Sequence, residues 1–345
     1  MDGDHVDQQL WACLRAYPSP PDATRDAPSP DLWARASEHG VALLLARQID
    51  HVGMAGDPRD AAFGQIALSL RSRAVLTEVL AIFASRRIPC APLKGPLLAA
   101  RLYDEFTLRP TTDVDVLVAP SDLDRAIDAL RSAGARPPEP ASYRYHRLHH
   151  HHVNSVLRGV LVEIHFRASS NFGTIIPAEP LLARATQAVV DGALVPVLDP
   201  TDELVCLAVN AAAHRFRAVL LLDLRRLCER APVDWREAEQ RARDWHVARA
   251  AAAALVAANL RAGLDLAPVS SAWRRQGERA LVLLPELPLR SEPHMQLRVR
   301  ELALQAILAD SYGRAGCMVL HNGLRGLRRR IYRTWPALSP WHWAG

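Results

Sequence analysis

Apolar residues recur at helical spacing along most of the chain, whereas strand-like alternation is confined to a central stretch. Residues 5–16, 31–51 and 60–87 carry apolar side chains three or four positions apart, the period of a helix with one buried face. The same spacing returns in "PTDELVCLAVNAAAHRF" (200–216) and continues to the end of the chain. Both ends of the chain are therefore predicted to be helical.

Short strands alternate with helices in the centre. "IPCAPLKG" (88–95) predicts a strand closed by a glycine, and "PLLAARLYDEF" (96–106) predicts a helix that begins with proline. "DVDVLVA" (113–119) has the alternation of a strand. "PSDLDRAIDALRSAG" (120–134) predicts a helix with Ser121 as its cap, an acidic first turn and a glycine stop. The order of these elements is that of a mixed α/β domain.

Residues 143–168 predict an antiparallel hairpin. "HHVNSVL" (151–157) and "VLVEIHFRA" (160–168) flank the dipeptide "RG" (158–159), which suits a two-residue turn. A further strand is predicted at "ALVPVLD" (193–199), directly before the C-terminal helices. The predicted parts of the chain are an N-terminal helical segment (1–59), an α/β domain (60–199) and a helical C-terminal domain (200–345).

Composition and charge narrow the class of protein. The 345 residues suffice for about two domains, and the net charge of +5 permits a polyanionic partner without requiring one. The five cysteines form no Cys-x-x-Cys pair, and the acidic start "MDGDHVDQQL" lacks the features of a signal peptide. The most apolar run, "AAAAALVAA" (250–258), is too short to span a bilayer. The sequence thus predicts a cytoplasmic protein with reduced thiols and no membrane span.

The predicted strand at 113–119 carries two charges on one face. Because strand side chains alternate, Asp113 and Asp115 point to one side while Val114 and Val116 point to the other. Carboxylates about 6–7 Å apart repel each other, and a cation between them relieves the repulsion. The ordinary alternative is an edge strand whose acidic face is solvated.

A second strand repeats this pattern, since Glu163 and His165 share a face opposite Val162 and Ile164. If the two strands are neighbours, three carboxylates converge. Oxygen ligands of this kind suit Mg²⁺ or Mn²⁺. Three acids on a sheet are the requirement of two-metal phosphoryl or nucleotidyl transfer.

The order "LKGPLLAARLYDEFTLRPTTDVDVLV" (93–118), followed by "VEIHF" (162–166), resembles the uncharacterised nucleotidyltransferase family of the DNA polymerase β superfamily. The resemblance covers roughly residues 60–230. It implies an α+β fold with a nucleotidyltransferase-like mixed sheet and flanking helices, next to N-terminal helices and a helical C-terminal domain. It also implies a catalytic metal site made of Asp113, Asp115 and Glu163.

The resemblance further implies that Lys94, Gly95 and Arg109 face the nucleotide. A glycine beside a helix start allows the backbone to approach phosphate closely. The chain departs from the wider superfamily here, because Lys94-Gly95 stands where Gly-Ser or Gly-Gly is usual. The alternative to a phosphate contact is that the side chains of Lys94 and Arg109 are solvated at the surface.

Two histidines are further candidates for nucleotide contacts. His165 could orient a phosphate or serve as a structural histidine in the sheet. His214 lies four positions after Asn210 on one predicted helix face. By the resemblance, His214 and Asp223 could form the roof of the cleft, and a polar pair that packs two helices is the alternative.

Two other segments carry suggestive composition. On a straight strand, His149 and His151 of "HRLHHHH" (146–152) would face away from His150 and His152, so no metal site is expected there; a strand edge or substrate contacts are favoured. The basic, tryptophan-containing "LRGLRRRIYRTWPALSPWHW" (324–343) could bind nucleic acid or anionic lipid, or form a solvated helix with a packed aromatic tail.

These observations predict a metal-dependent nucleotidyltransferase. It would move a nucleoside monophosphate from an NTP to a hydroxyl or similar group on a small-molecule or peptide acceptor and release pyrophosphate. One alternative is transfer of another phosphate-linked group to a peptide or natural product, and another is a non-catalytic nucleotide-binding protein. A nucleic-acid acceptor is not favoured, because the central domain is not especially basic.

Overall fold

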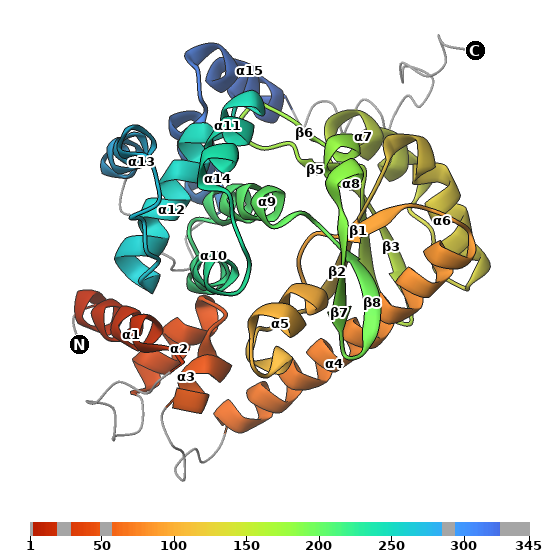
Figure 1. The fold of residues 1–345 in the computed structure, drawn as a ribbon, viewed down its shortest axis with the longest axis horizontal. Coiled ribbons are helices and arrows are strands. Elements are labelled where there is room, and N and C mark those ends of the chain that lie inside the picture. The colour runs from red at the N-terminus through yellow and green to blue at the C-terminus, as the bar shows by residue number, and fades with distance from the viewer. Residues whose placement is uncertain (1–2, 19–28, 49–56, 285–293, 325–345) are drawn as a thin grey trace.

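The computed structural model of the chain describes residues 3–18, 29–48, 57–284 and 294–324. Its fold is mixed α+β, as predicted: a small sheet with helices packed against it stands beside an array of helices (Figure 1). Among the described helices, none is both long and apolar enough to cross a membrane. The basic segment 325–343 lies outside the described residues.

The N-terminal part forms helices, with one difference from prediction. The helices are α1 (Gly3–Ala16), α2 (Pro30–Glu38), α3 (Ala42–Gln48) and α4 (Asp57–Ser85). The range 31–51 thus contains two helices rather than one. The chain turns at Gly40, whose φ of +73° lies in the left-handed region that glycine adopts without strain.

The main sheet has the strand order β1-β2-β4-β3. Its strands are β1 (Cys90–Pro92), β2 (Asp113–Val118), β3 (His152–Leu157) and β4 (Val160–His165). β2 runs parallel to β4, whereas the β1–β2 and β3–β4 pairs are antiparallel. The predicted hairpin is confirmed, because Leu157 pairs with Val160 across Arg158 and Gly159, whose φ values are 51° and 77°.

The helices between the strands follow the prediction except at one cap. α5 (Pro96–Leu102) and the short η1 (Phe106–Leu108) follow β1. The predicted helix at 120–134 begins with the 3-10 turn η2 (Pro120–Asp122) and continues as α6 (Leu123–Ser132). Ser121 is therefore inside the turn, and Asp122 takes the N-cap position without a side-chain capping bond.

A helix not expected from the sequence precedes the hairpin. α7 (Pro140–His149) begins with a proline at its first position, and strand β3 starts only at His152. The strand predicted at 193–199 is confirmed as β8 (Ala193–Val197). Its partner β7 (Thr186–Val190) was not apparent from the sequence. The remaining elements of this part are β5 (Arg167–Ser169), β6 (Ile176–Pro177) and α8 (Ala178–Arg184).

From residue 200 onward every described regular element is a helix, as predicted. These helices are α9 (Pro200–Ala213), α10 (Ala218–Arg230), α11 (Trp235–Asp244), α12 (Ala248–Ala262), α13 (Ser271–Leu283), α14 (His294–Leu308) and α15 (Tyr312–Gly323). α9 begins at an effective cap, since the Asp199 carboxylate accepts from the amides of Thr201 and Asp202.

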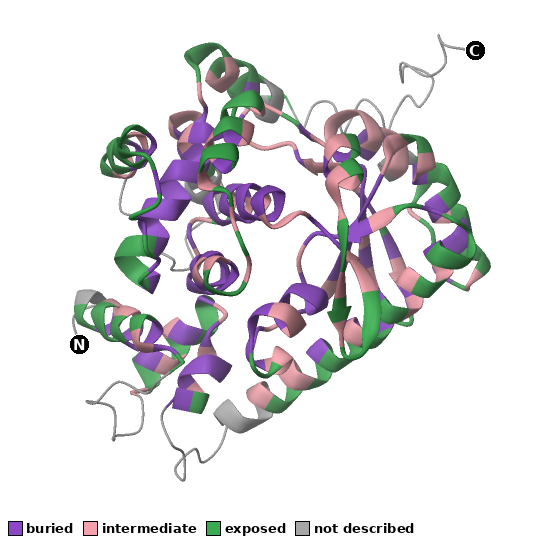
Figure 2. Ribbon diagram, in the orientation of Figure 1, coloured by how far each residue is buried: buried purple, intermediate pink, exposed green. Residues whose placement is uncertain are grey.

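Most buried apolar side chains of the described residues form two clusters. In one, β2 and β4 pack against α4 and α6 through Val114, Val116 and Ile164. The other joins Leu10 of α1 and Leu44 of α3 to the C-terminal helices, of which α9, α10 and α12 are mostly buried (Figure 2). The first and last parts of the chain therefore share a core, and boundaries at residues 59 and 199 stay a prediction.

His39 connects these two parts at the junction of α2 and α10. It is fully buried, and the amide of Ala218 donates to its Nδ1 (3.0 Å). The ring also meets Trp11 edge to face, with centroids 5.1 Å apart. Burial, followed by the charge of Arg35, lowers the pKa of His39 to about 3. The imidazole is therefore held neutral in the folded protein.

This burial predicts a loss of stability in mild acid. Because the folded pKa is below the unfolded value of about 6.5, the unfolded state binds the extra proton first as the pH falls. The free energy of unfolding should drop by up to about 2–3 kcal/mol between pH 6.5 and pH 4 through this group. His39→Asn should flatten the profile, and a substitution of the exposed His5 by asparagine is the surface control. Urea titrations at several pH values measure both. Parallel profiles for wild type and His39→Asn would contradict the prediction.

Candidate active site

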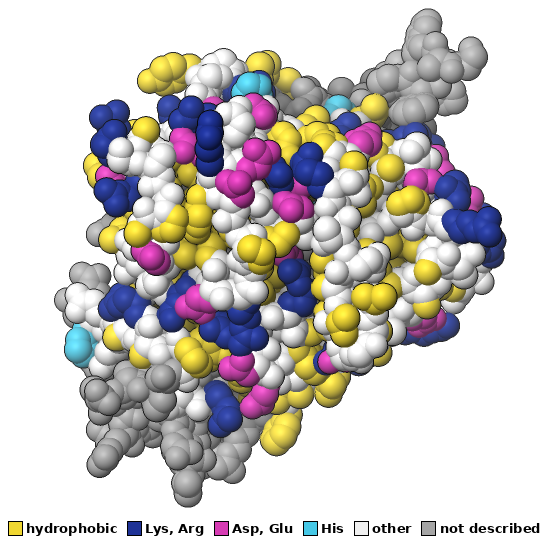
Figure 3. All heavy atoms as spheres, viewed as in Figure 1, with side chains coloured by type: hydrophobic (Ala, Val, Ile, Leu, Met, Phe, Trp, Pro, Cys, Tyr) yellow, Lys and Arg dark blue, Asp and Glu magenta, His cyan; other side chains and the backbone are white. Residues whose placement is uncertain are grey.

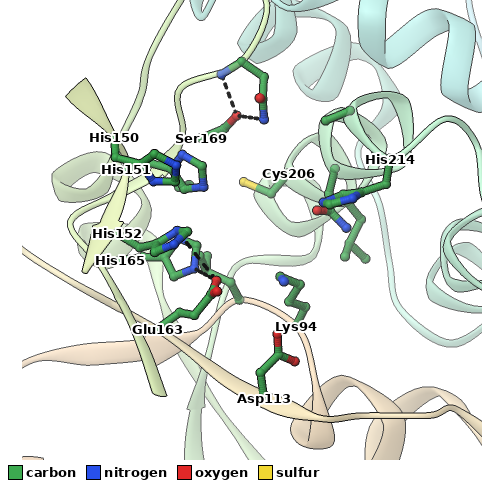
Figure 4. Close-up of a pocket in the computed structure, with 16 residues that line it drawn as sticks. Lys94, Asp113, His150, His151, His152, Glu163, His165, Ser169, Cys206 and His214 are labelled. Carbon is green, nitrogen blue, oxygen red and sulfur yellow. Dashed lines mark hydrogen bonds and ion pairs between the residues drawn. The ribbon is translucent and has the colours of Figure 1, made fainter. Parts of the chain in front are cut away.

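A cavity of about 350 Å³ lies between the main sheet and α9 (Figure 4). It lies within the size range of small-molecule sites. Its lining comes from the loop after β1, from β2 and β4, from β5 and the loop after it, from the residues that lead into β3, and from α9 on the opposite wall. The lining residues are Leu93, Lys94, Asp113, His150, His151, His152, Glu163, His165, Ala168, Ser169, Asn171, Cys206, Leu207, Asn210, Ala213 and His214.

Carboxylates from two neighbouring strands converge at one end of this cavity. β2 and β4 pair in a register that sets Asp115 beside Glu163. Each of Asp113, Asp115 and Glu163 offers an oxygen within 4.8 Å of the others. The expectation that the two strands are neighbours is confirmed, and Val114 and Val116 lie in the core on the opposite face.

Asp115 is the most buried and most tightly held of the three acids. Its Oδ1 lies 2.9 Å from Lys94 Nζ and 3.1 Å from His165 Nε2. Burial alone would raise the pKa of Asp115, but the charge of Lys94 and the His165 hydrogen bond outweigh it and hold the pKa well below its usual range. Burial also lowers the pKa of His165, yet its bonds to Asp115 and Glu163 leave the pKa above its ordinary value.

Asp113 differs from Asp115 in exposure and partners. It is only half-buried and lines the cavity, whereas Asp115 is buried behind the lining. Its pKa is raised, first by burial and then by repulsion from Asp115, and the charge of Lys94 offsets only part of this. The surroundings therefore destabilise the ionised form of Asp113, whereas they stabilise the ionised form of Asp115.

Lys94 is the only lysine in the 345 residues, so every other strongly basic side chain is arginine. It enters the cavity from the turn before α5, with about a quarter of its side chain exposed (Figure 4). Burial lowers the pKa of Lys94, but the charges of Asp115 and Asp113 raise it by more. The net pKa of Lys94 therefore lies above the ordinary value. A compact ammonium group is thus retained at one point where a guanidinium would be bulkier.

Gly95 makes this close approach of the turn possible. Its φ is +75°, and a Cβ at this position would lie 3.4 Å from the carbonyl oxygen of Asp113 and 3.9 Å from Asp115 Oδ2. A side chain would therefore be strained by the positive φ, although its Cβ would make only ordinary contacts with these atoms. Gly95 lies next to the cavity, although its own atoms are not part of the lining.

The opposite wall is provided by α9. His214, the C-cap residue of this helix, lines the cavity together with Asn210 and Cys206 (Figure 4). Burial, and then the charge of Lys94, lowers the pKa of His214 to about 4. The expected helix-borne wall is thus present, with a neutral imidazole at neutral pH.

The histidine run does not have the geometry of a straight strand. α7 ends at His149, the chain bends at His151, and β3 begins at His152. His150, His151 and His152 consequently line the same cavity, and each offers a nitrogen within 4.8 Å of the others. The expectation that alternation keeps them apart is wrong, because alternation applies only once the strand has begun.

With this geometry in view, a comparison with known families is informative. A family model described as an uncharacterised nucleotidyltransferase matches residues 26–263, a span that contains the entire cavity lining. The chain belongs to this family. It is accordingly a nucleotidyltransferase, a transferase of phosphorus-containing groups. A search of curated proteins found no match.

One residue expected to face the nucleotide lies elsewhere in this nucleotidyltransferase. Arg109 is 5% exposed and does not line the cavity. Its Nε and Nη2 donate to both oxygens of Asp223 at 2.8–3.0 Å, and the Tyr103 hydroxyl donates to the same carboxylate at 2.8 Å. Arg109 therefore ties the loop before β2 to α10, and Asp223 is its partner rather than part of a roof over the cleft. Surface solvation of Arg109 is excluded as well.

The carboxylates of the nucleotidyltransferase also suit a divalent cation. Asp115 Oδ2 is buried and has no hydrogen-bond partner among the described residues, although Oδ1 has two. A buried carboxylate oxygen without a partner is costly, and a cation satisfies it. The set of Asp113, Asp115 and Glu163 supplies only oxygen donors, the ligands that Mg²⁺ and Mn²⁺ prefer.

Proposed function

We propose that this nucleotidyltransferase moves a nucleoside monophosphate from an NTP, bound with Mg²⁺ or Mn²⁺, to an acceptor in the cavity between the sheet and α9. The observation that carries this proposal is the β2–β4 register, which brings Asp115 and Glu163 side by side with Asp113 at one end of the cavity. Convergent carboxylates beside a cationic side chain are suited to a triphosphate with its metal.

The residues have separate tasks in this proposal. Asp113, Asp115 and Glu163 hold the divalent ion, which when bound neutralises charge on the triphosphate. Lys94 neutralises a phosphate oxygen, since its ammonium group lies in the cavity beside Asp115. An acceptor oxygen attacks the α-phosphorus, the bond from this phosphorus to the bridging oxygen breaks, and pyrophosphate leaves. The acceptor proton passes to Glu163.

The acceptor is proposed to be a small molecule or a peptide group. A cavity of about 350 Å³ is within the size range of sites that bind small molecules. Basic and acidic side chains of the described residues are interspersed over the face in Figure 3, with no single-sign track on that face. Transfer of a different phosphate-linked group remains the second candidate, since the same carboxylates serve it.

Nucleotide binding should require the divalent ion, because a bare triphosphate and the carboxylates repel each other. Calorimetry with each NTP should show binding with Mg²⁺ and none with chelator, and pyrophosphate release should follow the same dependence. Equal affinity in chelator would exclude the proposed metal-dependent site.

Lys94 offers a second test of the same site. Lys94→Met should weaken Mg²⁺-NTP binding by roughly ten- to a hundredfold, the loss of one charge-assisted hydrogen bond. The exposed Arg131→Met, on α6, is the control and should leave affinity unchanged.

Since no other lysine exists in the chain, reductive methylation labels only Lys94 and the terminal amine. Mg²⁺-NTP should protect Lys94 from this labelling, and undiminished labelling would place the nucleotide elsewhere.

A further inference from the structure

The histidines at the start of β3 form a compact group of rings on one wall of the cavity. The ring centroids of His150 and His151 are 4.5 Å apart, those of His150 and His152 4.4 Å, and those of His151 and His152 4.7 Å. In Figure 4 these rings lie on the wall formed by β3, on the far side of Glu163 from Asp113. The imidazoles of the β3 wall therefore adjoin the carboxylates at Glu163, since His152, Glu163 and His165 also offer ligand atoms within 4.8 Å of one another.

The backbone explains how three consecutive residues can converge. His150 follows the last turn of α7, His151 lies in a bend, and His152 is the first residue of β3. The amides of Phe166 and Arg167 both donate to the carbonyl of His151, at 3.0 and 3.3 Å, which fixes this bend against the end of β4. The arrangement of the rings is thus set by main-chain bonds as well as by ring contacts.

One of the rings is already held by a neighbour. His151 Nδ1 and the Ser170 hydroxyl are 2.9 Å apart, within hydrogen-bond distance. Nε2 is therefore the nitrogen of that ring that can coordinate a metal. Metal-binding histidines usually have their second nitrogen fixed in this manner. The Nδ1 atom of His152 is buried and makes no hydrogen bond among the described residues. It lies 3.6 Å from Glu163 Oε2, and a bound metal ion would give it a partner.

The donor atoms distinguish the three histidines from the carboxylates. Imidazole nitrogens favour Zn²⁺, Co²⁺, Ni²⁺ and Cu²⁺, whereas carboxylate oxygens favour Mg²⁺ and Mn²⁺. Three histidine ligands with an open fourth position are typical of a Zn²⁺ site that binds a further group. His150, His151 and His152 all border the cavity, so the fourth position of an ion held by them would be accessible from it.

We propose that His150, His151 and His152 bind a transition-metal ion of the Zn²⁺ type, at a site that adjoins the Asp113–Asp115–Glu163 carboxylates through Glu163. The open position takes a metal-ligating group of the acceptor, such as a thiolate, imidazole or carboxylate, and anchors the acceptor opposite the nucleotide. Only this role of the open position rests on the proposed function. Metal binding itself requires no nucleotide and is tested without one.

Cobalt(II) is the probe for the site, because its visible absorption intensifies in tetrahedral coordination with nitrogen ligands. The full-length wild type, stripped with chelator, should bind one equivalent of Co²⁺ with such a band, and Zn²⁺ should displace it. The double variant His150→Asn/His151→Asn should lose the band. Ser170→Ala should weaken Co²⁺ binding by roughly ten- to a hundredfold, the usual effect of removing a group that orients a ligand.

Two controls separate this site from its surroundings. His149→Asn changes the neighbouring histidine on α7, which is in none of the metal-competent groups found among the described residues, and should leave the band unchanged. Asp113→Asn should also retain it, although Mg²⁺-dependent nucleotide binding is lost. The circular dichroism and melting temperature of each variant report folding. No band in the wild type, an unchanged band in the double variant, or its loss in Asp113→Asn would each overturn the proposal.

Discussion

Replacing Asp113 with asparagine should remove nearly all nucleotidyl transfer and leave the metal-free protein at least as stable as the wild type. The expected loss of activity is at least about a hundredfold, since changing even the residues that support metal ligands costs 10–100-fold. The stability result follows from the raised pKa of Asp113, caused by burial and by repulsion from Asp115. At neutral pH the folded state holds this carboxylate in its unfavoured ionised form, and asparagine removes the charge at nearly constant shape.

Asp115→Asn provides a contrast within the same site. It should lose activity to a similar extent, but it should destabilise the metal-free protein, because Lys94 and His165 lose their shared buried partner. Melting temperatures with chelator and with Mg²⁺-NTP, next to a pyrophosphate-release assay, compare the two variants. The exposed Asp128→Asn on α6 is the control for both. If Asp113→Asn were destabilised equally in both buffers, Asp113 would be a structural aspartate and not a ligand.

Asp223→Asn should lower the free energy of unfolding by about 3–5 kcal/mol, the usual cost of removing one partner from a buried ion pair. Arg109 is buried with its guanidinium directed at this carboxylate, and Tyr103 donates to it as well. In the variant, the guanidinium stays buried without a compensating charge. The loop that leads into β2 should loosen with it, so that transfer activity falls even though neither residue borders the cavity.

Replacing both partners tests whether the unpaired charge is the cause. The double variant Arg109→Met/Asp223→Leu removes both charges of this buried pair and should recover much of the stability lost in Asp223→Asn. Asp128→Asn interrupts an exposed ion pair, with both side chains 62% exposed, and should change stability by less than about 0.5 kcal/mol. Urea unfolding of the three variants gives the comparison. A double variant less stable than Asp223→Asn would show that the network contributes more than charge compensation.

The acidic strand could be predicted from the sequence because its signal is local. Alternation assigns Asp113 and Asp115 to one face regardless of the neighbouring strand, and it assigns Glu163 and His165 in the same manner. The sequence does not show that β2 and β4 are parallel neighbours, so it predicts convergence of the three carboxylates only if they are. The sequence contains a further signal of the site, since a single lysine among so many arginines marks Lys94 as chemically distinct.

Other features depend on distant contacts or on a change of secondary structure. Arg109 and Asp223 are 114 positions apart, so nothing near Arg109 reveals that its charge is already neutralised. For the histidines at 150–152 the sequence predicts a continuous strand, whereas in the structure Pro140 begins a helix that ends at His149 and the chain bends before β3. Side-chain direction could be deduced within an element, but not across the bend that joins two elements.

The shared core of the first and last helices has a consequence for synthesis on the ribosome. His39 meets Ala218 across 179 positions, so α2 emerges well before the helix that covers it. At 5–20 residues per second, this delay is roughly 10–35 s. During this time the apolar faces around Leu10 and Leu44 lack the partners that bury them in the finished protein. Nascent chains should therefore engage chaperones through their first fifty residues, and release depends on completion of α10 and α12.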